Sequence, residues 1–145
     1  MRHGRPTGLF ASRVNQAWWL IDKAALFARR DFTVVAVCRG DLLLHRLVVT
    51  PKWYRFPFMN ERDLQMGQLW TRHGARGQGY ARMAIEAVHA RFAGQYESMW
   101  YLVDENNLAS RRLIGRFGYS EAGRGERTAP FGLGALGRFV ITRPS

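Results

Sequence analysis

The sequence predicts a single α/β domain built on a mixed sheet, and three observations support this prediction. The chain has 145 residues, the length of one compact domain with one core. Hydrophobic residues make up 47% of it and charged residues 23%, a composition typical of a folded protein. Segments of helical and strand-like pattern follow in the order helix, three strands, helix, strand, helix, two strands. Neither a repeat nor a long linker divides residues 1–145.

The first predicted element is a helix. Ser12 can cap a helix that runs to about Arg29. Residues 1–11 before it are polar and punctuated by glycine and proline, and we expect them to be poorly ordered. No apolar run reaches the length of a membrane span, and Arg13 and Asn15 interrupt what would otherwise resemble a signal peptide. We therefore expect a cytoplasmic protein.

A β-hairpin is predicted next. Residues 32–38, "FTVVAVC", have the pattern of a buried strand, and residues 42–49, "LLLHRLVV", that of its partner. Gly40 and Asp41 between them are turn residues. Cys38 is the only cysteine, so the chain has no internal disulfide and a reducing compartment is expected. We expect this thiol to be buried and structural.

The remaining strands are separated by longer connections. Residues 50–63 form an aromatic and basic loop, followed by a strand, "LQMGQLWT", over residues 64–71. Gly67 inside that strand indicates a bulge or the close approach of another backbone. Further strands are predicted at residues 98–103, "SMWYLV", and in the tail at residues 119–127 and 137–143, which a glycine-rich stretch joins.

The most informative stretch is "RHGARGQGYARMAIEAVHARF", residues 72–92. Its second half is an amphipathic helix in which Ala81, Ile85, Val88 and Phe92 recur on one face. The glycines before it therefore lie between a strand and the start of a helix, where backbone N–H groups are unpaired and the helix dipole is positive. Such a place binds anions. The sequence is neither a Walker loop nor a dinucleotide fingerprint, and a purely structural glycine turn is the alternative.

Two motifs in this region resemble those of the GNAT superfamily of N-acetyltransferases. The first is R-x-x-G-x-A between a strand and an amphipathic helix, here Arg76 to Ala81. The second is a strand followed by Asn107, Ser110 and a short helix that ends in Gly118 and an aromatic residue. They occur in the order and spacing of that family, and the resemblance covers about residues 64–120. It implies a GNAT-like, mostly antiparallel mixed sheet flanked by helices.

The resemblance also implies that acetyl-CoA is the acyl donor. No metal is expected, because the histidines do not have the spacing of metal ligands. Backbone amides of the glycine loop would hold the pyrophosphate, and the end of the preceding strand would pair with the pantetheine arm and polarise the thioester carbonyl. Residues at the start of the second helix would lie beside the pantetheine and the nucleotide, although Asn107 can also be a simple helix cap. The expected cofactor-binding residues are Leu69, Trp70, Thr71, Arg76, Gly77, Gln78, Gly79, Tyr80, Ala81, Asn107, Ser110 and Arg111.

The catalytic groups are less defined by the sequence. Many members of the family place a tyrosine in the second helix to protonate the leaving thiolate, but the matching position here is Ile114. Tyr101 is the alternative acid, and water is another. His45 and Glu105 are the first candidates for a base, because a histidine titrates near neutrality and a carboxylate after a strand lies at the mouth of an open site. The alternative is that His45 is a structural histidine with a satisfied hydrogen bond and that the carboxylates are turn or cap residues. Asp63 and Asp104 are further carboxylates at strand ends, and His73 and His89 are expected to be exposed bystanders.

The acceptor is an amine that the sequence does not identify. Aromatic and basic residues in the loop 51–63 suit a sugar nucleotide, and the loop resembles those of family members that acetylate amino sugars for surface polysaccharides. The same aromatic residues can equally be core residues beneath a loop. A homodimer is compatible with either interpretation.

The charge of the chain leaves other functions open. Lys and Arg number 22 against 11 Asp and Glu, which gives a formal net charge of +11. An acidic partner or a compositional bias toward arginine explains this excess. A family member that acetylates a protein N-terminus or an aminoacyl-tRNA is therefore one alternative, with nucleic acid as a less favoured partner. A non-catalytic CoA-binding module is the other.

Overall fold

A computed structural model describes residues 32–130 and 137–142 of the chain. The predicted N-terminal helix, the poor order expected for residues 1–11, and the glycine-rich residues 131–136 lie outside the described residues. The described part contains the predicted three strands, helix, strand, helix and two strands in that order. The expected α/β fold class is therefore confirmed.

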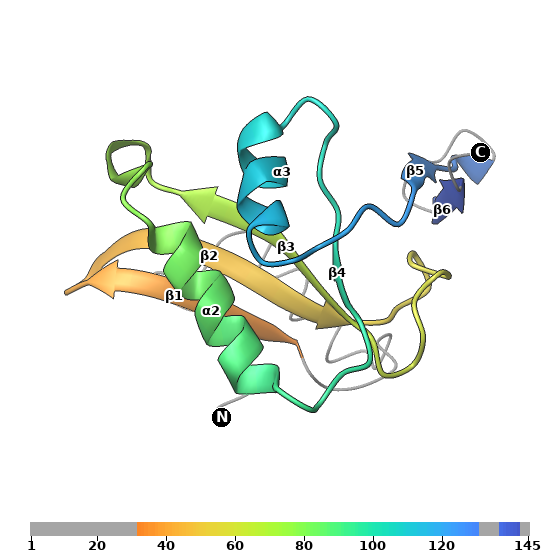
Figure 1. Cartoon of the computed structure of the whole chain (residues 1–145), viewed down its shortest axis with the longest axis horizontal. Helices are drawn as coiled ribbons and strands as arrows, with labels where there is room; N and C mark the ends of the chain where they lie inside the picture. Colours follow the sequence, from red (N-terminus) through yellow and green to blue (C-terminus); the bar gives the residue numbers. More distant parts are fainter. Residues whose placement is uncertain (1–31, 131–136, 143–145) are drawn as a thin grey trace.

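The central sheet has four strands in the order β1-β2-β3-β4 (Figure 1). β1, Thr33–Arg39, and β2, Leu42–Pro51, form the predicted antiparallel hairpin, with Gly40 at a positive φ of 55° in the turn. β3, Leu64–Thr71, is antiparallel to β2, whereas the short β4, Met99–Tyr101, is parallel to β3. The sheet is thus mixed and mostly antiparallel, as expected.

Two helices lie on one face of this sheet (Figure 1). A short 3-10 helix, η2, His73–Ala75, leads from β3 into α2, Tyr80–Phe92, which is the crossover to the parallel strand β4. α3, Leu108–Gly115, follows β4. The core on this face packs α2 and Ile114 of α3 against β2 and β3, and its buried members are Leu47, Val49, Leu64, Met66, Ala84, Ile85, Val88, Phe92 and Ile114.

A second, aromatic cluster covers the opposite face of the sheet. Trp53, Phe56 and Met59 from the loop after β2 are buried there, and Trp100 and Leu102 pack against them. Because side chains alternate along a strand, Trp100 lies on this face while its neighbours Met99 and Tyr101 pack on the helical face. Most of the loop aromatics are thus core residues.

The two tail strands form a ribbon of their own. β5, Arg124–Arg127, pairs with β6, Phe139–Thr142, in a separate antiparallel sheet. The first strand is shorter than the expected residues 119–127, because residues 119–123 do not pair as a strand. The ribbon is joined to the loop after β2, where the Phe139 amide donates to the Arg55 carbonyl oxygen at 2.8 Å.

Asp63 fixes the start of β3. Its buried carboxylate accepts hydrogen bonds from the backbone amides of Asn60 and Ser98, at 2.8 and 3.0 Å, and from the Trp100 indole at 2.8 Å. A candidate base on sequence grounds, this carboxylate instead ties the loop, β3 and β4 together.

Two local expectations are wrong. Cys38 is exposed and not buried, because β1 is an edge strand of the described sheet and Cys38 lies near its end. His89 is half-buried and not exposed, because Tyr96, Phe117 and Tyr119 surround its ring. No helix among the described residues is long and apolar enough to cross a membrane.

Candidate active site

The centre of the candidate site is an irregularity in β3. Val48 is opposite Gly67 and Arg46 is opposite Trp70, so β3 carries one more residue than β2 between these pairs. The extra residue is accommodated at Gln68, which has a positive φ of 54°. This is the bulge that Gly67 predicted. The residue with the unusual backbone conformation is nevertheless the neighbour of the glycine.

Beyond the bulge, β3 is no longer paired with β4. The two strands pair only from Leu64 with Met99 to Met66 with Tyr101. Figure 1 shows them separating, with α3 in front of the space between them. An unpaired strand edge of this kind can accept another extended chain.

Backbone alternation determines which β3 amides face this gap. The Leu64 amide donates to Ser98 on the β4 side, whereas the Arg72 amide donates back to Leu44 of β2. Since consecutive amides alternate along a strand, those of Leu69 and Thr71 face the gap after the bulge. The expected residue Trp70 lies between them and has 39% of its surface exposed.

The glycine loop ends at the first turn of α2. Gly77 and Gly79 have φ values of 75° and 82°, which is the left-handed region that favours glycine. Gly79 is the residue before the helix and forms no side-chain cap, and a Cβ added to it or to Gly77 would meet nothing within 4 Å. Among the described residues, the first helical amide that donates to another backbone group is that of Met83, to the Gly79 carbonyl oxygen. The amides of Tyr80, Ala81 and Arg82 before it are thus donors at an open, positively polarised helix end.

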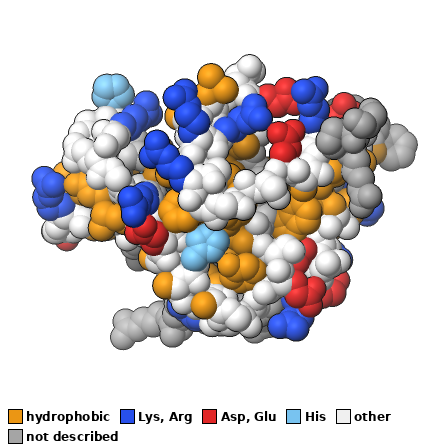
Figure 2. Space-filling view, viewed as in Figure 1, with side chains coloured by type: hydrophobic (Ala, Val, Ile, Leu, Met, Phe, Trp, Pro, Cys, Tyr) orange, Lys and Arg blue, Asp and Glu red, His pale blue; other side chains and the backbone are white. Residues whose placement is uncertain are grey.

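Side chains hold this loop in place without covering its open side. Gln78 Nε2 donates to the Gly74 carbonyl oxygen at 3.0 Å. Arg39 donates to the Tyr80 hydroxyl at 3.1 Å, and Arg72 Nε to the Leu43 carbonyl oxygen at 3.0 Å. Arg76 is exposed. Figure 2 shows Lys and Arg side chains gathered over this loop and over α3, on the side of the molecule that carries the gap.

The start of α3 borders the gap from the other side. Asn107 caps the helix, because its Oδ1 accepts a hydrogen bond from the Ser110 amide at 3.1 Å. The Ser110 hydroxyl is 3.2 Å from that of Tyr101, which is half-buried. Burial raises the pKa of Tyr101, and the hydrogen bond to Ser110 partly opposes this increase. Ile114, one turn further along α3, is buried in the core.

The two predicted bases lie apart from each other. His45 is fully buried in β2 opposite Thr71, and its Nδ1 is 2.7 Å from the Thr71 hydroxyl. Burial, with the charge of Arg46 adding to it, lowers the pKa of His45 to about 4. Glu105 is exposed after β4, where its carboxylate is 3.3 Å from Arg124 Nε.

The remaining charged candidates have local partners. Asp104 accepts from the Asn106 amide at 2.8 Å and so closes a turn. Arg111 is paired with Glu121 at 3.3 Å and lies near the Glu105 carbonyl oxygen. His73 is exposed in η2, as expected.

A pocket of about 230 Å³ opens on the other face of the sheet, directly behind the bulge. Gly67 and Gln68 of the bulge form part of its wall, with Thr50 and Gln65, whose side chains are 3.3 Å apart, beside them. The aromatic loop and the tail ribbon complete it through Trp53, Arg55, Phe56, Arg127 and Phe139, with Val48 and Leu102. The loop therefore contributes both to the core and to a pocket.

Sequence motifs locate the gap but only part of the pocket. The glycine loop, the end of β3 and the start of α3 lie around the gap. Thr50, Gln65 and Arg127 were not among the predicted site residues, because none belongs to a motif. Only the alternation of β2 and β3 could have indicated that Thr50 and Gln65 share a face with Gly67.

Comparison with known proteins identifies the family of the chain. A sequence model of the acetyltransferase (GNAT) family matches residues 4–119. A search of curated protein sequences gives no match. At identities below 20%, the similar solved structures described next show the fold alone.

An N-acetyltransferase from Staphylococcus aureus Mu50 has a TM-score of 0.60 and 18% identity, with 83% of this chain and 69% of that chain covered. A ribosomal-protein-alanine N-acetyltransferase from Brucella melitensis has a TM-score of 0.59 and 19% identity, with 84% and 71% covered. The integron cassette protein VCH_CASS6 from V. cholerae has a TM-score of 0.52 and 16% identity over 62% of this chain, which spans 55% of that protein's length. The family model, which matches most of the chain, shows that the chain belongs to the acetyltransferase (GNAT) family, a family of N-acetyltransferases.

Proposed function

We propose that the chain transfers an acetyl group from acetyl-CoA to a primary amine by direct attack within a ternary complex. The observation that carries this proposal is the position of the β3 bulge, which borders the open gap on one face and the pocket on the other. A donor lying in the gap and an acceptor lying in the pocket would meet at Gly67 and Gln68. Holding two reactants in this way makes their reaction effectively unimolecular.

The donor would be held by backbone groups. We propose that the amides of residues 77–82 bind the pyrophosphate of acetyl-CoA and that the exposed Arg76 adds positive charge. The amides of Leu69 and Thr71 would pair with the pantetheine arm, and the Leu69 amide, next to the bulge, would polarise the thioester carbonyl. Asn107, Ser110 and Arg111 would form the opposite wall.

Tyr101 is our candidate for the acid that protonates the leaving thiolate. Its hydroxyl is 3.2 Å from that of Ser110, on the face of α3 that also carries Ile114, where many relatives have their tyrosine. A raised pKa keeps this phenol protonated at neutral pH. The proton would pass from the Tyr101 hydroxyl to the sulfur as the carbon–sulfur bond breaks. The nitrogen, which becomes cationic on attack, would release a proton to solvent as the amide forms, and the phenolate would regain one from solvent.

The amine would have to enter without its proton, because none of the described residues that line the pocket is a candidate base. His45 is buried on the helical face and Glu105 lies beyond the end of β4. We therefore propose that the amine loses its proton to solvent before it enters. The proposed acceptor is an amino sugar or sugar nucleotide of surface-polysaccharide synthesis, which the aromatic pocket wall suits.

Release of free CoA with a panel of amines tests this proposal. Glucosamine, amino-sugar nucleotides, peptides and a sample without amine would be compared by thiol detection, with the N-acetyl product identified by mass. We expect product from at least one small amine. Tight binding of acetyl-CoA without any product would instead indicate a CoA-binding module.

A macromolecular acceptor is the second candidate function, and the net charge of +11 favours it. Retention on immobilised tRNA that falls steeply with salt, together with acetylation of the bound RNA's aminoacyl group, would support that candidate over a small amine.

A further inference from the structure

A glutamine side chain is held in a fixed orientation in the pocket behind the bulge. Gln65 is opposite Thr50 in the pairing of β3 with β2, and both side chains line the pocket. The Thr50 hydroxyl donates to Gln65 Oε1 at 3.3 Å, and Thr50 is only 3% exposed. Because this bond engages the oxygen of the carboxamide, its nitrogen Nε2 lies on the side away from Thr50.

The nitrogen of this carboxamide lies over Gly67. A Cβ added to Gly67 would be 3.2 Å from Gln65 Nε2, and the φ of Gly67 is outside the left-handed region. The missing side chain at Gly67 thus leaves room for the carboxamide. Within the described part of the chain, nothing accepts a hydrogen bond from Nε2. Gln65 therefore presents an N–H group to a ligand of the pocket, directly at the bulge.

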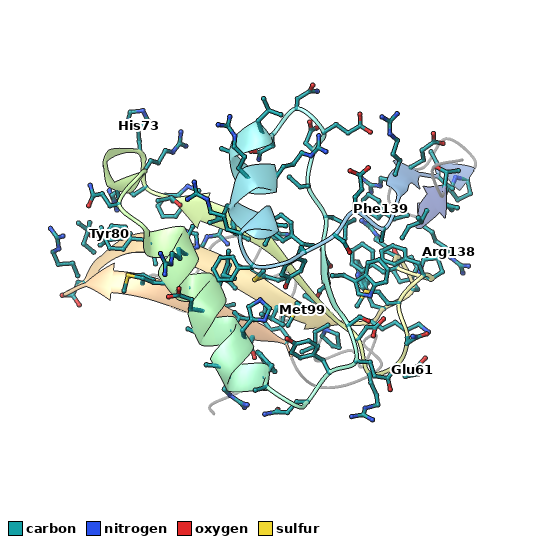
Figure 3. All side chains as sticks on the ribbon, in the orientation of Figure 1. Glu61, His73, Tyr80, Met99, Arg138 and Phe139 are labelled. Carbon is teal, nitrogen blue, oxygen red and sulfur yellow. The ribbon has the colours of Figure 1, made fainter. Side chains whose placement is uncertain are left out.

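Apolar side chains make up much of the wall around this ligand site. Val48, Phe56, Leu102 and Phe139 belong to it. The ring of Phe139 lies 5.5 Å from that of Phe56, and Figure 3 shows Phe139 turned toward the body of the molecule. An N–H group without a partner is costly in such surroundings, so a ligand that supplies an acceptor atom is favoured over one that does not.

The chemistry of amide formation restricts what this N–H group can bind. The attacking nitrogen needs its lone pair for the thioester carbon, so a hydrogen bond to that lone pair would block the reaction. The N–H group must therefore bind another atom of the amine substrate. Since it lies at the bulge, where the two substrates would meet, that atom has to be close to the amine. An oxygen on the carbon next to the one that carries the amine meets this requirement.

We propose that Gln65 selects amines that carry an oxygen on the neighbouring carbon, and that Thr50 positions Gln65 for this role. This inference rests on the proposed acetyl transfer and names its substrate class. Gln65 Nε2 donates to the oxygen, and the amine lies beside it at Gly67. Amino sugars carry such an oxygen as a hydroxyl, and α-amino carbonyl compounds carry it as a carbonyl. A pocket of about 230 Å³ is smaller than usual drug-sized sites, so it takes a single sugar or amino-acid unit.

Matched pairs of amines test the proposal. The isomers 2-aminocyclohexanol and 4-aminocyclohexanol form the hydroxyl pair, and glycinamide and β-alaninamide form the carbonyl pair. Within each pair the oxygen moves away from the amine, and rates are compared at equal concentrations of the unprotonated amine. We expect kcat/KM for the member with the neighbouring oxygen to be about five- to tenfold higher in at least one pair, the effect of one neutral hydrogen bond.

Variants of the pocket assign this preference to the carboxamide. Gln65→Met keeps the length of the side chain without its N–H group and should make the two rates of a pair about equal. Thr50→Val releases the carboxamide and should lower the preference, whereas Thr50→Ser keeps the hydroxyl and should keep the preference. Gly67→Ala should lower it as well, because the added Cβ displaces Nε2 by a few tenths of an ångström.

Gln95→Met is the matched control. Gln95 is an exposed glutamine after α2 and does not line the pocket, so this variant should keep the rates and the preference of the wild type. Thermal unfolding of each variant checks that it is folded.

A preference in the hydroxyl pair alone supports the proposal with an amino sugar-like substrate, and one in the carbonyl pair alone supports it with an α-amino carbonyl substrate. Similar values of kcat/KM within both pairs overturn the proposal, as does a preference that survives Gln65→Met. If acetyl-CoA binds and no amine is acetylated, the acetyl transfer itself is wrong and this inference fails with it. Acetylation without a preference overturns the inference alone.

Discussion

We propose that Tyr101 takes, at the gap, the acid role that many relatives give to a tyrosine of the second helix. Ile114 fills the core where many relatives have a tyrosine, and Tyr101 reaches the same face of α3 from β4. The phenol thus comes from the strand and not from the helix. Because burial raises its pKa, it stays a proton donor over the neutral pH range.

Removing the Tyr101 hydroxyl should slow the chemical step. We expect Tyr101→Phe to lower kcat by about 10- to 100-fold with little change in KM for acetyl-CoA, at the lower end of general acid catalysis because a thiolate leaves readily. Steady-state kinetics measure both constants. Tyr119→Phe is the control, since that tyrosine is also half-buried but bonds to His89 at 3.3 Å. An unchanged kcat in Tyr101→Phe would assign the acid to water.

At the scale of elements, the site depends on where strands pair and where they separate. β4 pairs with β3 over three residues only, and the bulge then turns β3 away from it. Asp63 holds the paired end through three hydrogen bonds from two segments besides its own strand. The buried Asp63 carboxylate thus holds β3 and β4 together where they pair, and the gap between them opens beyond the bulge.

Loss of that carboxylate should unfold the chain at a lower temperature. Asp63→Ala leaves three donors unpaired, two of them backbone amides, and we expect it to cost roughly 3 kcal/mol of unfolding free energy. For a chain of this length the midpoint should fall by about 10 °C, which calorimetry can measure. Glu61→Gln is the matched control, because Glu61 lies in the same loop and its pair with Lys52 is exposed. Equal midpoints for the two variants would show that Asp63 does not hold the strands.

At the scale of the whole molecule, a buried histidine links stability to pH. His45 has a pKa of about 4 in the folded chain against 6.5 when unfolded, so the folded state disfavours its proton. The part of the unfolding free energy that comes from this pKa difference is fully present above pH 6.5 and is lost as the pH falls toward 4. His89, whose pKa burial also lowers, acts in the same direction.

Urea unfolding at pH 7 and pH 5 measures this linkage. Between pH 7 and pH 5 we expect the unfolding free energy of the wild-type chain to fall by about 2 kcal/mol more than that of His45→Gln. Only the wild type has an imidazole at this position that must stay unprotonated in the folded state. The His89 contribution is common to both chains and cancels in the comparison. If the unfolding free energies of the wild type and of His45→Gln fall by the same amount, His45 can be protonated without unfolding the chain.

Much of the architecture follows from the sequence pattern, because each part depends on neighbours along the chain. The stripe of Ile85, Val88 and Phe92 predicts the buried face of α2, and Gly67 predicts the bulge. The features that the sequence pattern does not predict depend on contacts between residues distant in sequence. Cys38 is exposed near the end of β1, which is an edge strand of the sheet that residues 32–130 form, and this position is set by the order of the strands.

The candidate site is likewise only partly predictable from the sequence. The glycine loop and Asn107 belong to contiguous motifs, so the sequence alone singles them out, and their contact with acetyl-CoA stays a prediction. Arg127 reaches the pocket only because its ribbon pairs it with Phe139, across a connection that has no motif. The burial of His45 likewise depends on the sheet and helix packed around it, and "LLLHRLVV" alone does not indicate it.

We propose that the amides at the start of α2 bind the pyrophosphate of acetyl-CoA, and calorimetric titration of acetyl-CoA into two variants of Gly79 tests this binding mode. Asparagine and aspartate both tolerate the left-handed backbone at this position and have nearly the same shape, so only the charge separates Gly79→Asn from Gly79→Asp. We predict that Gly79→Asp binds acetyl-CoA at least about tenfold more weakly than Gly79→Asn, because a carboxylate would lie beside the phosphates. Equal affinity of the two folded variants would contradict the claim.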